Sequence, residues 1–130
     1  MDYKILIIII ILFPFVDFFY LNYMSDHFKE LVLTITKEKM VFNYTKAIIA
    51  YIFLILALYY FILYNIDSQN LYQKIQDAVV LGLVIYGTYD FTNGAIFKDY
   101  DYKTSVIDTI WGATLFGLIT ILSYNIKNLI

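Results

Sequence analysis

Four apolar runs, each of about 20 residues, constrain the fold of this sequence more than any other feature. At 1.5 Å per residue, a helix of that length crosses the roughly 30 Å hydrocarbon core of a bilayer. The expected spans are residues 5–24, 44–64, 78–97 and 104–124. Tyrosines such as Tyr20, Tyr64 and Tyr124 gather near the span ends, where amphipathic rings favour the head-group level. The sequence therefore predicts one all-α domain over residues 1–130, an integral membrane bundle of four transmembrane helices.

The composition excludes several classes of partner and site. The chain is 62% hydrophobic and 15% charged, whereas about a quarter of the residues in ordinary soluble domains are charged. A net charge of −2 without any basic block gives no electrostatic footprint for nucleic acid. The absence of cysteine excludes a thiolate metal site. We expect no cofactor and a lipid bilayer as partner, and homo-oligomers or complexes with other membrane proteins stay open.

The connections between the spans differ in character. The longest, residues 25–43, places Phe28, Leu31, Val32 and Ile35 at helical spacing, which predicts a short interfacial helix after the first span. A plain polar loop is the alternative. The third connection, residues 98–103, is tight, so the third and fourth spans should be antiparallel neighbours. Lysines favour the side of these two connections, which predicts that both termini lie outside the cytoplasm.

Three aspartates, Asp17, Asp90 and Asp108, lie within the expected spans. A charged side chain at the centre of a transmembrane helix costs about 2.5–3.5 kcal/mol on the insertion scale, so each acid needs a reason. Their distances from the span ends place all three in the half of the membrane that faces the first and third connections. Asn93 belongs to the same layer, one helical turn after Asp90.

Helical spacing predicts that these polar side chains meet between helices. Gly82, Tyr86, Asp90 and Asn93 form one stripe of the third span, and Asp108, Trp111 and Gly112 form the matching stripe of the fourth. With no arginine in the sequence, a proton, a bound cation or a polar ligand must compensate the acids. We predict a polar site that is open toward one membrane face. The candidate ligand- or ion-binding residues are Asp17, Asp90, Asn93, Asp108, Tyr86 and Trp111, and the sequence specifies no metal.

Three functions are consistent with this pattern. The first is an aspartate-lined intramembrane pocket that binds or conducts a small ligand, proton or cation. The second is a structural or scaffolding component of a membrane, a viral membrane included, in which the acids only hydrogen-bond helices together. The third is a membrane enzyme that acts on lipid, with an aspartate as acid or base. The sequence has no nucleophile–base pair and no HExxH-type spacing, which disfavours the enzyme and gives no candidate catalytic residue.

Two blocks of the sequence also resemble a known family. Tyr86–Asn93 reads YGTYDFTN, and Asp108–Gly112 reads DTIWG. Together they resemble the paired blocks of the small four-span membrane proteins catalogued as domain of unknown function 2177, and VDFFYL at Val16–Leu21 is similar to the end of that family's first span. The resemblance implies four helices and membrane residence, and it implies no particular activity.

Overall fold

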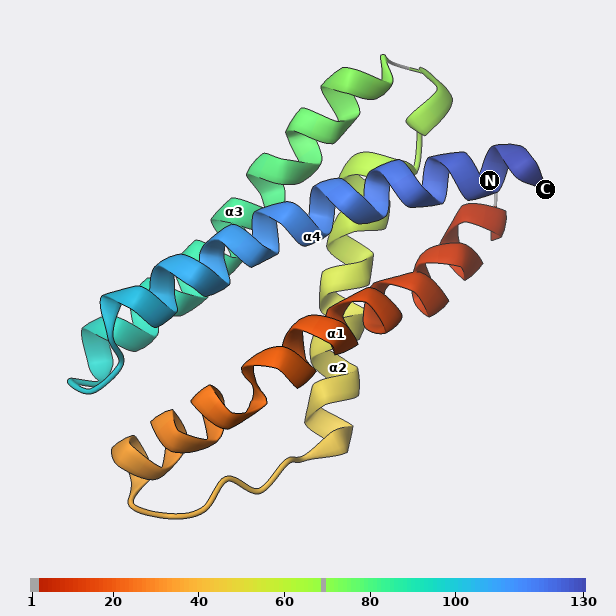
Figure 1. The fold of residues 1–130 in the computed structure, drawn as a ribbon. Helices are drawn as coiled ribbons and strands as arrows, with labels where there is room; N and C mark the ends of the chain where they lie inside the picture. The colour runs from red at the N-terminus through yellow and green to blue at the C-terminus, as the bar shows by residue number, and fades with distance from the viewer. Residues whose placement is uncertain (1–2, 69) are drawn as a thin grey trace.

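The computed structural model describes residues 3–68 and 70–130, and these residues form an all-helical chain. Four helices are long and apolar enough to cross a membrane, which confirms the predicted fold class (Figure 1). The elements are α1 (Tyr3–Thr36), α2 (Tyr44–Leu58), the π-helical turn η1 (Tyr59–Leu63), the short η2 (Ile66–Ser68), α3 (Leu71–Ile96) and α4 (Tyr102–Leu129). The second span therefore consists of α2 and η1 together.

The segment after the first span is helical, but it is not a separate helix. Ser25, expected near the start of a new helix, instead lies inside α1, which runs for 34 residues without a break. At 1.5 Å per residue α1 is about 51 Å long, well beyond the hydrocarbon thickness. It ends where Lys37 adopts a positive φ of 62° and Thr36 turns its hydroxyl back onto the Val32 carbonyl. The second half of α1 therefore continues the span as part of the same helix.

The third and fourth spans form the antiparallel hairpin that the short connection predicts (Figure 1). α3 begins at Leu71, seven residues earlier than expected, because Asn70 caps its first turn through Tyr72 N. Asp101 caps α4 by accepting a hydrogen bond from Thr104 N at 3.3 Å. Hydrogen bonds from the Thr104 side chain and, to a lesser extent, from its backbone N–H lower the pKa of Asp101. Both helices are thus fixed at their N-terminal ends by side chains from the connections.

Glycine allows α3 and α4 to approach closely. A Cβ at Gly82 would overlap the Gly112 carbonyl group, and a Cβ at Gly112 would overlap the Tyr86 ring. Such small-residue contacts take the place of hydrophobic association between helices in a membrane. Gly82, Tyr86 and Gly112, which belong to the stripes predicted from the sequence, therefore lie at the contact between the two helices.

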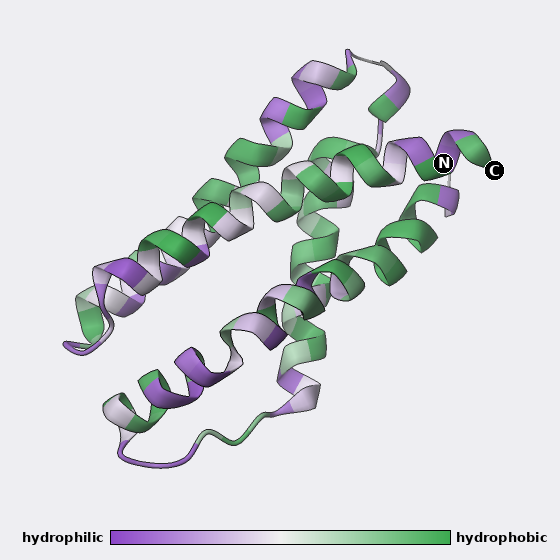
Figure 2. Ribbon diagram, viewed as in Figure 1, coloured by the Kyte–Doolittle hydropathy of each residue, from purple (hydrophilic) through white to green (hydrophobic). Residues whose placement is uncertain are grey.

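The apolar core lies on the far side of the bundle from the connections that flank the acids. Phe13 is fully buried and makes edge-to-face contacts with Phe116 and Tyr51, at centroid distances of 5.7 and 6.0 Å. The other buried apolar side chains there are Ile5, Ile9, Leu58, Ile62, Leu63, Leu115 and Ile119. The first half of α1 and most of α2 consist of hydrophobic residues, whereas the second half of α1 is more hydrophilic (Figure 2). Many of these hydrophobic side chains are exposed, among them Ile7 and Ile11 on α1 and Ile52 and Phe53 on α2. This distribution suits a bundle whose outer surface meets lipid.

Candidate functional site

The three intramembrane aspartates are all buried, and they come from three different helices. Asp17 lies on α1, Asp90 on α3 and Asp108 on α4. Each carboxyl group accepts a hydrogen bond from an aromatic side chain. Because a polar group in hydrocarbon has no water to bond, such partners are what allow the acids to be buried. Together the acids and their donors form one polar layer, which we call the acid layer.

Asp17 forms the first part of the acid layer. Its two carboxyl oxygens accept hydrogen bonds from the Tyr51 hydroxyl at 2.6 Å and from Trp111 Nε1 at 2.8 Å. These contacts join α1 to α2 and to α4. The Trp111 ring stacks on Tyr20 with a centroid distance of 4.7 Å and an interplanar angle of 11°. Asp17 is therefore fully occupied by partners that also fix three helices relative to one another.

Asp108 is linked to Asp17 through that ring stack. The Tyr20 hydroxyl donates to Asp108 Oδ1 at 2.8 Å, while the Tyr20 ring rests on Trp111. Tyr20 on α1 and Trp111 on α4 therefore connect the two acids. Asp108 is 9% exposed, more than the other two acids.

Asp90 is the most deeply buried acid of the layer. Its side chain is 0% exposed, and the Tyr100 hydroxyl donates to its Oδ1 at 2.5 Å. The side chains of Asp108 and Thr109 adjoin the same carboxyl group. Asp90 Oδ2 and Thr109 Oγ1 nevertheless have no hydrogen-bond partner. Among the described residues of the acid layer, these are the buried side-chain atoms that lack a hydrogen-bond partner.

A groove of about 790 Å³ adjoins the acid layer, between the second half of α1 and the C-terminal end of α3. We call it the α1–α3 groove. Its apolar lining comes from Phe18, Leu21, Phe28, Leu31, Val32, Ile35, Met40, Phe42 and Phe97, with Tyr44, Tyr89 and Tyr100. Its polar lining is Asn22, Ser25, Thr36, Asn93 and Asp108. The residues at helical spacing after the first span thus line a groove beside the acid layer.

The structure divides the six residues predicted for the site into three groups. Asp108 and Asn93 line the α1–α3 groove, whereas Asp17, Asp90 and Trp111 belong to the acid layer without lining it. Tyr86 packs on Gly112 and the Phe116 ring. Within the part of the chain that the structure describes, no three His, Cys, Asp or Glu residues could hold a metal ion together.

The donors to the acids were not foreseen from the sequence. Their positions at span ends predict an interfacial role for Tyr20 and Tyr100, and the sequence pattern predicts no role for Tyr51. Tyr51 could have been found, because it is an isolated polar side chain in the middle of the second span.

His27 lies outside the groove, and its Nε2 is 2.7 Å from Thr104 Oγ1. It therefore joins α1 to the start of α4.

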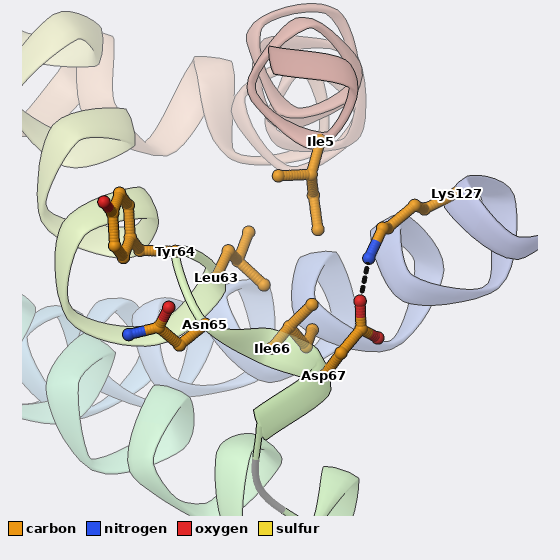
Figure 3. A pocket seen from close by; sticks show the side chains of 7 residues that line it. All are labelled: Ile5, Leu63, Tyr64, Asn65, Ile66, Asp67 and Lys127. Carbon is orange, nitrogen blue, oxygen red and sulfur yellow. Dashed lines mark hydrogen bonds and ion pairs between the residues drawn. The ribbon is translucent and has the colours of Figure 1, made fainter. Parts of the chain in front are cut away.

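A smaller pocket of about 380 Å³ lies at the opposite end of the bundle (Figure 3). Ile5, Leu63 and Ile66 form its apolar side, and an ion pair between Lys127 and Asp67 closes its edge. The start of α1 and the end of α4 meet there, so both lie at the membrane face opposite the acid layer. None of the intramembrane acids reaches this pocket.

The length, apolarity and packing of the four helices define a multi-pass integral membrane protein. Its chain belongs to the family described as "Predicted membrane protein (DUF2177)", whose sequence model matches residues 3–125. That match confirms the resemblance noted in the two sequence blocks. No curated protein and no solved structure matches the chain.

Proposed function

We propose that this membrane protein binds one amphiphilic molecule in the α1–α3 groove. The apolar part of the ligand lies among the α1 side chains, and a cationic or hydrogen-bond-donating head group meets Asp108 and Asn93. The observation that carries the proposal is the position of the Asp108 carboxyl group at the boundary between the acid layer and the groove. Asp108 Oδ1 is bonded to Tyr20, and the carboxyl group keeps further acceptor capacity for a ligand.

The size and chemistry of the groove support a small-molecule ligand. Pockets for small molecules commonly measure about 300–1,000 Å³ and are mostly apolar, with a few polar groups that fix orientation. The groove has about 790 Å³ and five polar side chains among its apolar ones. A single alkyl chain with a small head group suits this lining better than a hydrated ion does, because an ion requires polar contacts on all sides.

Binding is favoured over conduction by the packing beyond the acid layer. Phe13, Phe116 and Ile9 are each 0% exposed and fill the bundle on the side away from the groove. A transmembrane path through a single chain would have to displace this core. We therefore propose that the groove ends at the acid layer and takes up its ligand from one face of the membrane only.

A structural role for part of the acid layer is a second candidate, and it applies to Asp17. Both oxygens of Asp17 have aromatic donors, and the residue does not line the groove. Interhelical hydrogen bonds of this kind stabilise helix association in membranes. We propose that Asp17 joins helices while Asp108 and Asn93 face the ligand.

The test of the proposed function is the binding of a single-chain alkylamine to the purified protein in lipid nanodiscs. Trp111 is the only tryptophan in the sequence, and its ring stacks on Tyr20, whose hydroxyl donates to Asp108. The fluorescence of Trp111 therefore responds to ligand binding at Asp108. We expect Asp108→Asn to weaken binding at least about 10-fold, since hydrogen bonds to charged groups contribute about 1.5–3 kcal/mol. Asp99→Asn is the matched control, because it makes the same substitution in the connection before α4, at a residue that does not line the groove.

The uncharged alcohol of the same chain length provides a matched ligand. We expect it to bind the wild-type protein more weakly than the amine and to be nearly insensitive to Asp108→Asn. If Asp99→Asn and Asp108→Asn weakened amine binding equally, the overall negative charge and not a contact with Asp108 would explain the binding. That result would contradict the proposal. Equal affinity for amine and alcohol in the wild-type protein would remove the role assigned to the carboxyl group.

A further inference from the structure

We infer that Asp90 and Asp108 form a carboxyl pair that holds one proton between them. This site goes beyond the proposed amphiphile binding and does not depend on an occupant of the groove. Its geometric basis is one fully buried acid with an unpartnered oxygen, placed against a second acid on the neighbouring helix.

The unpartnered atom is Asp90 Oδ2. Oδ1 of the same side chain accepts from Tyr100, but Oδ2 has no hydrogen-bond partner and no exposure to solvent. A buried carboxylate oxygen without a donor is costly, and native structures seldom leave one. A carboxylic acid removes this cost, because a protonated Oδ2 becomes a donor.

Acceptors for that proton are at hand. The Asp108 carboxyl group is close enough to Asp90 for a hydrogen bond, and such a bond between two carboxyl groups requires one proton. Thr109 Oγ1 adjoins the same corner and also has no partner. A proton on Oδ2 therefore provides the interaction that these two buried atoms lack.

No ion pair to Asp90 or Asp108, within residues 3–68 and 70–130, takes the place of the proton. The titratable groups that face the pair are Tyr20 and Asp17 on α1, Tyr86 on α3 and Tyr100 in the connection before α4. These are neutral hydroxyls and one further acid. Two carboxyl groups that adjoin each other disfavour double ionisation, so one shared proton leaves the pair with a single negative charge.

Infrared spectroscopy of the purified protein in lipid tests this inference without any ligand. The carbonyl band of a protonated carboxyl group is separate from the bands of carboxylates, and isotopically labelled aspartate assigns it to this residue type. We expect the wild-type protein to show a protonated aspartic acid at neutral pH. Asp90→Asn should abolish the band because its amide can donate to Asp108, and Asp17→Asn should retain it.

Two results would overturn the inference. One is the absence of a protonated aspartic acid in the wild-type protein at neutral pH. The other is a band that persists in Asp90→Asn or disappears in Asp17→Asn. If Asp90→Asn does not fold, Tyr100→Phe replaces it, since this change removes the hydrogen bond to Asp90 Oδ1 and should shift the band in frequency. An unshifted band in Tyr100→Phe would also contradict the assignment.

Discussion

Gly82→Ala is expected to destabilise the α3–α4 hairpin severely. The added Cβ would overlap the Gly112 carbonyl group, which is backbone and cannot rotate away as a flexible side chain can. Overpacking of a close interface costs about 1–3 kcal/mol, and backbone contacts belong to the upper part of that range. Because the acid layer depends on the register of α3 against α4, we also expect the Asp90 and Asp108 contacts to be disturbed. The measurement is thermal unfolding in detergent, monitored by the loss of helical circular dichroism.

Gly94→Ala is the matched control for this prediction. Gly94 is on the same helix, but the nearest atoms to an added Cβ are Ser105 Oγ and the Tyr100 carbonyl oxygen, both at 3.8 Å. That distance is an ordinary van der Waals contact, so the variant should unfold near the wild-type temperature. Equal stability of the two alanine variants would mean that α3 and α4 do not approach as closely as the structure describes.

Asp17→Leu is expected to have the second large effect on stability. The change leaves the Tyr51 hydroxyl and Trp111 Nε1 without an acceptor inside the bundle. Each unsatisfied buried donor costs about 1–3 kcal/mol, so the loss should be about 2 kcal/mol or more. The residue joins α1 to α2 and α4, and we therefore expect α2 to be the first helix to separate. Thermal unfolding and protease sensitivity of the loop before α2 would measure both effects.

Asp17→Asn distinguishes hydrogen bonding from charge at this position. An asparagine carbonyl can accept from Trp111, and its amide can donate to the Tyr51 hydroxyl, so both contacts survive. We expect this variant to retain most of the stability that Asp17→Leu loses. If the two variants were equally unstable, the negative charge rather than the hydrogen bonds would hold the helices. If both were as stable as the wild-type protein, Asp17 would have no structural role.

The arrangement of the helices was largely predictable from the sequence. The apolar runs located the four spans, and the positions of Asp17, Asp90 and Asp108 within them gave a common membrane half. Successive spans cross the membrane in opposite directions, so acids that lie at similar depths in their spans meet in one layer of the structure. The stripe containing Gly82 and Tyr86 was also correctly assigned to a helix contact, since helical periodicity determines which residues share a face.

The grouping of the acids could not be predicted in the same way. Depth along a helix does not give the rotation of one helix about its axis relative to another, and that rotation determines which acid pairs with which donor. Tyrosines are common at both membrane interfaces. The sequence therefore did not distinguish Tyr20 and Tyr100, which donate to the acids, from the other tyrosines at span ends. In the structure, Asp17 is linked to Asp108 through the Tyr20–Trp111 stack, whereas Asp90 adjoins Asp108 directly.

The α1–α3 groove depends on the continuity of α1 beyond the first span, whereas the sequence pattern predicted only the apolar helical face of that segment. The spacing of Phe28, Leu31, Val32 and Ile35 indicated an apolar helical face, which an interfacial helix would turn toward lipid. Because α1 instead continues without a break, this face remains directed along the bundle and lines the groove. The continuity of one helix thus converts a predicted membrane-surface segment into one wall of the proposed binding site.

Native mass spectrometry of the protein released from nanodiscs tests the proposed binding most directly. Val32 lines the groove, whereas its neighbour Leu33 is 51% exposed and does not. We predict that the wild-type protein and Leu33→Trp each retain one bound amphiphile per chain, and that Val32→Trp, which fills the groove, retains none. A wild-type protein without a bound amphiphile, or a Val32→Trp variant that retains it as well as Leu33→Trp does, would contradict the account.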